Sequence, residues 1–111
     1  MSSYKNILME LLQEAIAEIY SGALVFHEIT ESGFYCDFDM PEPMNPEKIN
    51  EVTKWLSSKD ISCAYELSAF SGAYLDGDSR KKMLQRIYVA AFGTQAELQA
   101  YQSKIAKAAG P

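Results

Sequence analysis

Strand-like segments in this chain come in pairs, and this pairing constrains the fold more than any other feature. Residues 23–30 and 34–39 form the first pair, and the second of them alternates apolar and polar side chains as a half-buried strand does. The link at 31–33, Glu-Ser-Gly, is typical of a hairpin. Residues 61–70 and 84–92 form the second pair, on either side of a turn-rich segment. The pairs predict a mostly antiparallel sheet of about four strands.

Three segments with helical periodicity separate and flank the strand pairs. Residues 4–20 carry apolar side chains at three- and four-residue steps, and Gly22 is expected to end that helix. Asn45 followed by proline starts a second helix that should end near residue 59. A third helix follows a capping box that begins at Thr94. The order α-β-β-α-β-β-α predicts an α+β fold with three helices.

Composition indicates an ordinary globular domain. The 111 residues suit a single module over 1–111, and 48% hydrophobic residues argue against disorder. The net charge of −5 is unevenly spread: residues 1–51 hold two bases against ten acids, whereas residues 52–111 hold eight bases against five acids. We expect a cytoplasmic protein with free thiols, because no leader-like or membrane-spanning segment is evident and the cysteines number only two.

Few residues could support catalysis. His27 is the single histidine, and its position in a strand predicts an edge or hydrogen-bonded role rather than a general base. Cys36 falls on the apolar side of its strand, where cysteine usually acts as a small hydrophobe. Asp37 projects from the other side, where it could act as an acid or base or simply lie on a solvated face. We expect no metal or cofactor, because zinc needs three or four Cys or His ligands.

The remaining candidate site is a basic cluster with aromatic neighbours. Bases flanked by tyrosines suit a nucleic-acid backbone with stacked bases, although an ordinary solvated turn has the same composition. The predicted binding residues for nucleic acid or another anion are Arg80, Lys81, Lys82 and Arg86, with Tyr74 and Tyr88 beside them.

Two blocks of sequence resemble a known family. Residues 72–92, GAYLDGDSRKKMLQRIYVAAF, closely resemble a signature of threonyl-tRNA synthetases, found in the second N-terminal domain. This editing domain is shared with alanyl-tRNA synthetases. Upstream, GFYCDFD at 33–39 and the proline-marked helix at 45–56 match the same family in the same order. The resemblance therefore covers nearly the whole chain and implies a similar, shortened fold.

The departures from the family pattern concern the catalytic residues. The family's editing site hydrolyses serine attached to threonine tRNA and uses an HxxxH and a CxxxH motif. Counted back from Gly33, the HxxxH positions fall on Lys5 and Met9. The stretch that carries CxxxH is missing, and Cys63 has no histidine four residues later. The resemblance thus implies a stand-alone editing-type domain with a degenerate active site.

Three hypotheses follow. The preferred one is a non-catalytic binding module for the tRNA end, an aminoacyl-nucleotide-like ligand or a protein partner. The second is a small hydrolase that deacylates mischarged tRNA with Cys36, Asp37 or His27. The third is a structural protein that acts by self-association, because exposed sheet edges favour a homodimer.

Overall fold

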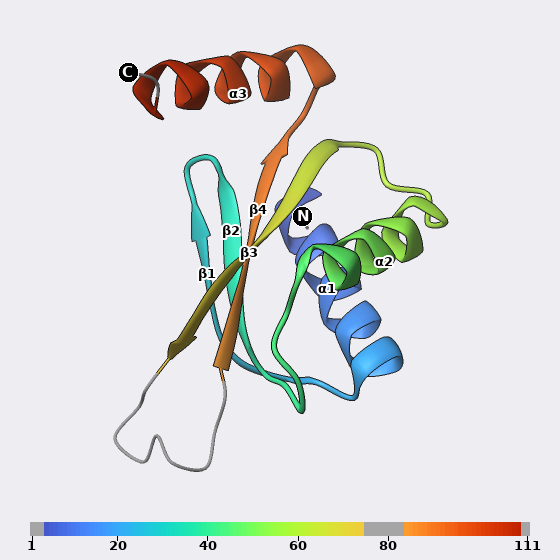
Figure 1. Ribbon diagram of the computed structural model, residues 1–111. Helices are drawn as coiled ribbons and strands as arrows, with labels where there is room; N and C mark the ends of the chain where they lie inside the picture. Colours follow the sequence, from blue (N-terminus) through green and yellow to red (C-terminus); the bar gives the residue numbers. More distant parts are fainter. Residues whose placement is uncertain (1–3, 75–83, 110–111) are drawn as a thin grey trace.

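The computed structural model describes residues 4–74 and 84–109, and for residues 70–74 and 107–109 the backbone only. The elements run in the predicted order (Figure 1). They are α1 (Tyr4–Tyr20), β1 (Ala23–Thr30), β2 (Gly33–Asp39), α2 (Pro46–Ser57), β3 (Ala64–Tyr74), β4 (Leu84–Phe92) and α3 (Gln95–Ala109). The α+β fold is therefore confirmed.

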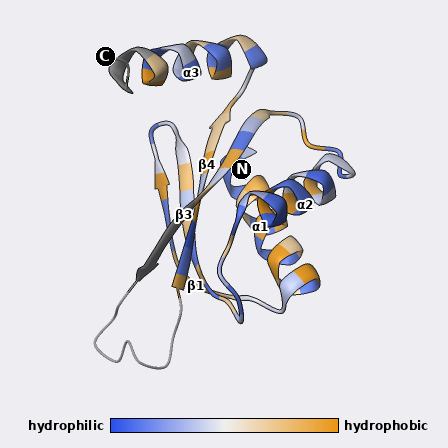
Figure 2. Cartoon of the chain, viewed as in Figure 1, coloured by the Kyte–Doolittle hydropathy of each residue, from blue (hydrophilic) through white to orange (hydrophobic). Residues whose placement is uncertain are grey.

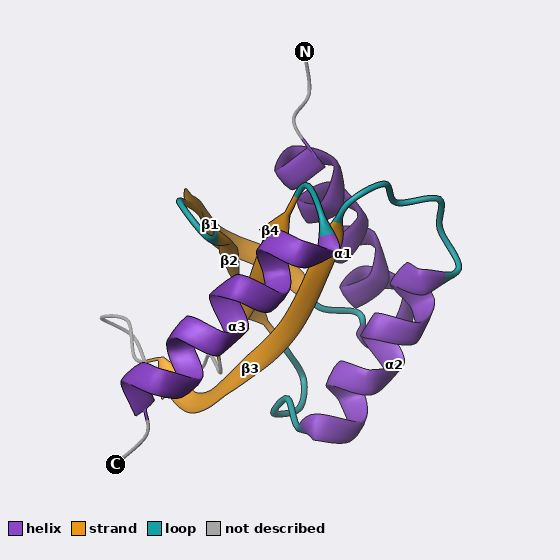
Figure 3. Ribbon diagram, turned by 90° about the horizontal axis from the view of Figure 1, so that it is seen from above, coloured by secondary structure: helices purple, strands orange, loops and turns teal. Residues whose placement is uncertain are grey.

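The four strands form one antiparallel sheet in the order β1-β2-β4-β3. β2 and β4 are central, and β1 and β3 are the two edges. Helices α1 and α2 lie on one side of the sheet and α3 crosses the other side (Figure 3). The sheet thus has one face covered by two helices and one face covered only in part.

The hydrophobic core lies between the sheet and the pair α1 and α2. Alternation in β2 and β4 sends every second side chain into it, while α1 contributes one apolar stripe. The fully buried large side chains include those of Phe34, Phe38, Leu8, Leu12, Ile16, Leu56 and Ile87. Burial of this apolar surface is the main term that holds the helices on the sheet.

Local signals explain most element ends. The side chain of Asn45 accepts a hydrogen bond from the Lys48 backbone N–H at 2.8 Å, and the first turn of α2 contains proline, as predicted. At the end of α1 the left-handed residue is Ser21, with φ of 56°, and not the predicted Gly22. Gly22 is needed for space, because a Cβ there would lie 2.5 Å from the Ile16 side chain.

The strand predicted at 61–70 begins and ends later than expected. β3 starts at Ala64 because Ile61 closes a turn after α2, with its N–H donating to the Lys59 carbonyl at 3.0 Å. The strand then continues to Tyr74, with a register shift between Phe70 and Tyr74. The first part of the predicted turn-rich segment, 71–74, is therefore strand, and its part at 75–83 lies outside the described residues.

No helix in the described ranges is both long enough and apolar enough to cross a membrane.

Candidate functional site

The sheet face turned away from α1 and α2, called the open face below, carries three rows of paired residues. Directly opposed residues of neighbouring antiparallel strands share a face, so the strand register defines each row. One row is Phe26, Asp37 and Arg86; the next is Glu28, Tyr35, Tyr88 and Ser68; the last is Thr30, Gly33, Ala90 and Glu66. Polar and aromatic side chains from four strands therefore meet on one surface.

The first row contains a bidentate ion pair between Arg86 and Asp37. Arg86 donates from Nε to Asp37 Oδ1 at 2.8 Å and from Nη2 to Oδ2 at 3.0 Å. The Asp37 side chain is nearly buried, at 5% exposure for the residue. The positive charge of Arg86 is largely balanced by this carboxylate, so its guanidinium contributes a flat surface and hydrogen bonds more than net charge.

Aromatic rings form a continuous ladder across the open face. The Phe26 and Tyr35 ring centroids are 6.1 Å apart, and those of Tyr35 and Tyr88 are 5.8 Å apart. The Arg86 guanidinium lies 3.9 Å from the Tyr35 ring centroid. Tyr35 Oη donates to Glu28 Oε2 at 2.9 Å, and this hydrogen bond raises the pKa of Tyr35. Arg86 and Glu28 thus hold the Tyr35 ring in place. Tyr88 remains 41% exposed.

A cleft lies between the ladder and α3. It has a volume of about 430 Å³ and is bounded by Tyr88 and Ser68 on the sheet and by Tyr101 and Ile105 on α3. Its floor includes Ala90, which pairs with Gly33 in the last row. The small residues there leave room below the helix.

Gly33 is a requirement of this floor. A Cβ at Gly33 would lie 1.9 Å from the Val89 carbonyl oxygen, and its φ is +155°. No other residue fits without moving β4.

The wall made by α3 is attached at its first half. Tyr101 stacks on Phe92 with the ring centroids 5.2 Å apart, and Gln102 Nε2 donates to Glu66 Oε2 at 2.6 Å. Thr94 caps the helix as predicted, because its hydroxyl accepts the Glu97 N–H at 3.2 Å, and that hydroxyl also donates to Glu97 Oε1 at 3.0 Å. These contacts fix the distance of α3 from the sheet.

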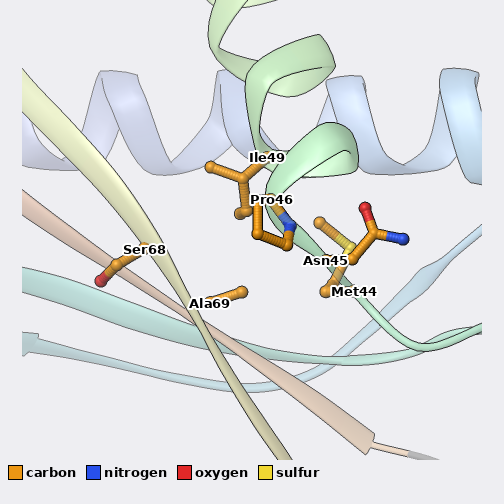
Figure 4. A pocket seen from close by; sticks show the side chains of 6 residues that line it. All are labelled: Met44, Asn45, Pro46, Ile49, Ser68 and Ala69. Atoms are coloured by element: carbon orange, nitrogen blue, oxygen red, sulfur yellow. The ribbon is translucent and has the colours of Figure 1, made fainter.

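A second cavity, of about 470 Å³, lies at the start of α2 beside β3 (Figure 4). Its described lining is Met44, Asn45, Pro46, Ile49, Ser68 and Ala69. None of these residues is charged, and the Asn45 side-chain oxygen is already engaged by the Lys48 N–H. The described lining offers space but no acid, base or nucleophile, so the open face remains the better candidate site.

The structure places two of the three catalytic candidates on one side of the sheet and the third on the other. His27 pairs with Cys36 across β1 and β2, so both point to the helix-covered side, whereas Asp37 lies on the open face. Cys36 is fully buried, and burial, followed by the charge of Asp37, raises its pKa to about 12. The Cys36 thiol is therefore protonated near neutral pH and is a poor nucleophile. Asp37 is not on a solvated face, as one interpretation had it, because Arg86 covers it.

The positions where the resemblance places histidines hold structural side chains. Lys5 Nζ donates to the backbone carbonyls of Thr30 at 2.8 Å and Glu31 at 3.1 Å. Met9 is 7% exposed and belongs to the core. Within the part of the chain that the structure describes, no three His, Cys, Asp or Glu side chains gather where a metal could bind.

The structure describes only part of the predicted basic cluster. Arg86 lies within β4 and not in the turn with which the sequence grouped it, and Tyr88 follows it on the same face. Tyr74 ends β3, and nothing further is described for its side chain. Arg80, Lys81 and Lys82 lie outside the described residues.

Sequence reasoning missed the ladder and the cleft. The signal was present, because Tyr35 and Asp37, like Arg86 and Tyr88, are two residues apart in predicted strands and so share a face. What was missing was the strand order that brings β2 beside β4, together with the position of α3.

Comparison with known proteins points to one group of enzymes. The threonine–tRNA ligase of Citrifermentans bemidjiense is 25% identical over 160 residues, which cover 88% of this chain and 25% of the ligase. That of Pelobacter propionicus is 25% identical over 157 residues, with 86% and 25% covered. That of Magnetococcus marinus is 49% identical over 45 residues, which are 40% of this chain and 7% of the ligase.

The chain is distantly similar to part of threonine–tRNA ligases. It spans about a quarter of the length of the two relatives that match most of it. Both of those alignments are longer than the 111 residues of this chain, so the ligases have positions there without a counterpart here. No protein-family model matches the chain. The predicted resemblance to threonyl-tRNA synthetases is thus confirmed at this distant level.

Proposed function

We propose that this protein is a shortened, non-catalytic relative of the synthetase editing domain that acts as a binding module. The alignments support a shortened form because they require positions that this chain lacks. Loss of catalysis is supported by Lys5 and Met9, which take structural roles where the resemblance places histidines. The protonated Cys36 thiol supports the same conclusion.

The ligand of the module is the single-stranded end of a tRNA or an aminoacyl-nucleotide-like molecule. The observation that carries this proposal is the ladder Phe26–Tyr35–Tyr88, which stays partly exposed and leads to the cleft below α3. Aromatic platforms of this kind stack unpaired bases, and each stacked base contributes about 1–3 kcal/mol. At the cleft, the Ser68 hydroxyl can donate or accept a hydrogen bond with a nucleoside, and the Glu66 carboxylate, which also accepts from Gln102, can accept one.

Phosphate contacts come from the second half of the chain, which holds eight bases against five acids. Arg86 is engaged with Asp37. We therefore assign the phosphates to Arg80, Lys81 and Lys82, which follow the end of β3 in sequence. Such contacts make binding weaken as the salt concentration rises.

The test is binding of labelled threonine tRNA, followed by fluorescence anisotropy at several salt concentrations. Tyr88→Ala should weaken binding by about tenfold, as expected for one lost stacking platform. Tyr88→Phe keeps the ring and should bind nearly as the parent does. Lys81→Glu with Lys82→Glu should reduce both affinity and its dependence on salt.

Two outcomes would overturn the proposal. Undetectable binding at low salt would remove the nucleic-acid ligand. Deacylation of seryl-threonine tRNA by the parent protein, lost in Cys36→Ala, Asp37→Asn or His27→Ala, would show an enzyme instead.

A further inference from the structure

One edge of the sheet is unprotected along most of its length. In the described sheet β1 pairs with β2 alone, and every residue from Val25 to Ile29 is exposed. Val25 is 49%, Phe26 51% and Ile29 44% exposed, so three large hydrophobic side chains crowd one strand. Figure 2 shows hydrophobic and hydrophilic parts in β1, which lies at the side of the molecule.

The other edge strand, β3, has more contacts with helices. Two helices, α2 and α3, pack against β3, and Gln102 of α3 bonds to Glu66 within it, whereas β1 packs mainly against α1. Isolated edges are usually blunted by lysine, proline or a bulge. β1 contains no lysine, arginine or proline, and its one irregularity is the register shift at Val25, between Leu24 and Phe26, so the strand is regular from Phe26 onwards.

The sequence of β1 complements itself when two copies run antiparallel about His27. In that register Val25 of each copy lies opposite Ile29 of the other along the strand, so two exposed aliphatic residues are brought near each other at each end of the pairing. Glu28 faces Phe26, and no two carboxylates oppose each other. A register centred on Glu28 would instead place two carboxylates together, which is unfavourable.

We propose that β1 pairs with β1 of a second copy of this chain, antiparallel and centred on His27, to form a continuous eight-stranded sheet. The two-fold axis is perpendicular to the sheet, because antiparallel strands of identical copies are related in this way. Both open faces then lie on the same side, and the two aromatic ladders approach each other through Phe26. The inference rests on the edge strand and is independent of the proposed function.

A disulfide at the two-fold axis tests the register. Opposed residues of antiparallel strands have Cα atoms about 4.5–5.5 Å apart, within the range of about 4.4–6.8 Å that a disulfide spans. In a Cys63→Ser background, His27→Cys should therefore form a covalent dimer under mild oxidation. Asn50→Cys, at an exposed position of α2, is the matched control and should stay monomeric.

Sedimentation equilibrium tests the dimer without any covalent link. The parent should dimerise with a dissociation constant in the micromolar range, since a single strand pair is a small interface. Val25→Lys with Ile29→Lys should raise that constant at least tenfold. Asn50→Lys with Ser57→Lys adds the same charge to α2 and should not.

Three results would overturn the proposal: a parent that remains monomeric at hundreds of micromolar, a dimer unaffected by the two lysines in β1, or equal cross-linking of His27→Cys and Asn50→Cys. Circular dichroism of each variant shows that loss of the dimer is not loss of the fold.

Discussion

The pair Asp37–Arg86 shows how a single contact can organise a surface. Asp37 is almost fully buried and receives both hydrogen bonds from one guanidinium. Arg86→Leu leaves that carboxylate without its partner, so we expect the free energy of unfolding to fall by about 3 kcal/mol. The double variant Asp37→Leu with Arg86→Leu should recover part of this loss, because no lone buried charge remains. Urea unfolding measures all three, and strictly additive losses would contradict this account.

Cys36 makes a prediction about alkaline stability. Burial raises its pKa from 9.0 to about 12, so the folded state keeps a proton that the unfolded state loses above pH 9. The unfolded state then binds fewer protons, and the free energy of unfolding falls as pH rises. Cys36→Ala should fall less steeply above pH 9, although it starts lower at neutral pH because of the cavity. The pKa of Tyr20 is also raised to about 12, but Tyr20 is present in both the parent and Cys36→Ala. If the free energy of unfolding falls with pH equally steeply in the two proteins, Cys36 does not have this role.

At the scale of elements, α3 is the part whose position matters most for the site. It is attached to the open face by Tyr101 on Phe92 and by Gln102 on Glu66. Tyr101→Ala should therefore lower the hydrogen-exchange protection of α3 by about tenfold or more, equivalent to about 1.4 kcal/mol or more. Protection in α1 and α2 should not change. Equal loss in all three helices would show that α3 is not an independent unit.

Local signals predicted the elements well, and long-range contacts limited the prediction of the site. The caps at Asn45 and Thr94 and the hairpin at Gly33 depend on neighbours in sequence, and the structure contains all three. The joining of Asp37 to Arg86 depends on the strand order β1-β2-β4-β3, which alternation alone does not determine. The start of β3 at Ala64 was predicted too early, at residue 61. The apolar Ile61 fits a strand pattern, but it lies in a turn that follows α2.

At the level of the whole molecule, the two sheet faces differ in what they hold. The hydrophobic core, which includes Met9 and Cys36, lies at the face covered by α1 and α2. The open face holds the aromatic ladder, the ion pair and the cleft below α3. The uneven charge follows a different division, because the acidic first half supplies α1, β1 and β2 and the more basic second half supplies β3, β4 and α3.

The open face is the proposed binding surface, and mapping a bound ligand on it by NMR tests this proposal. An oligonucleotide with the sequence of the tRNA 3′ end is titrated into the labelled protein, and backbone amide shifts are followed. We predict that the largest changes lie at Tyr35 and Tyr88 and in the first half of α3, with little change in α2. Changes confined to α1 and α2, or no changes at saturating oligonucleotide, would contradict the claim.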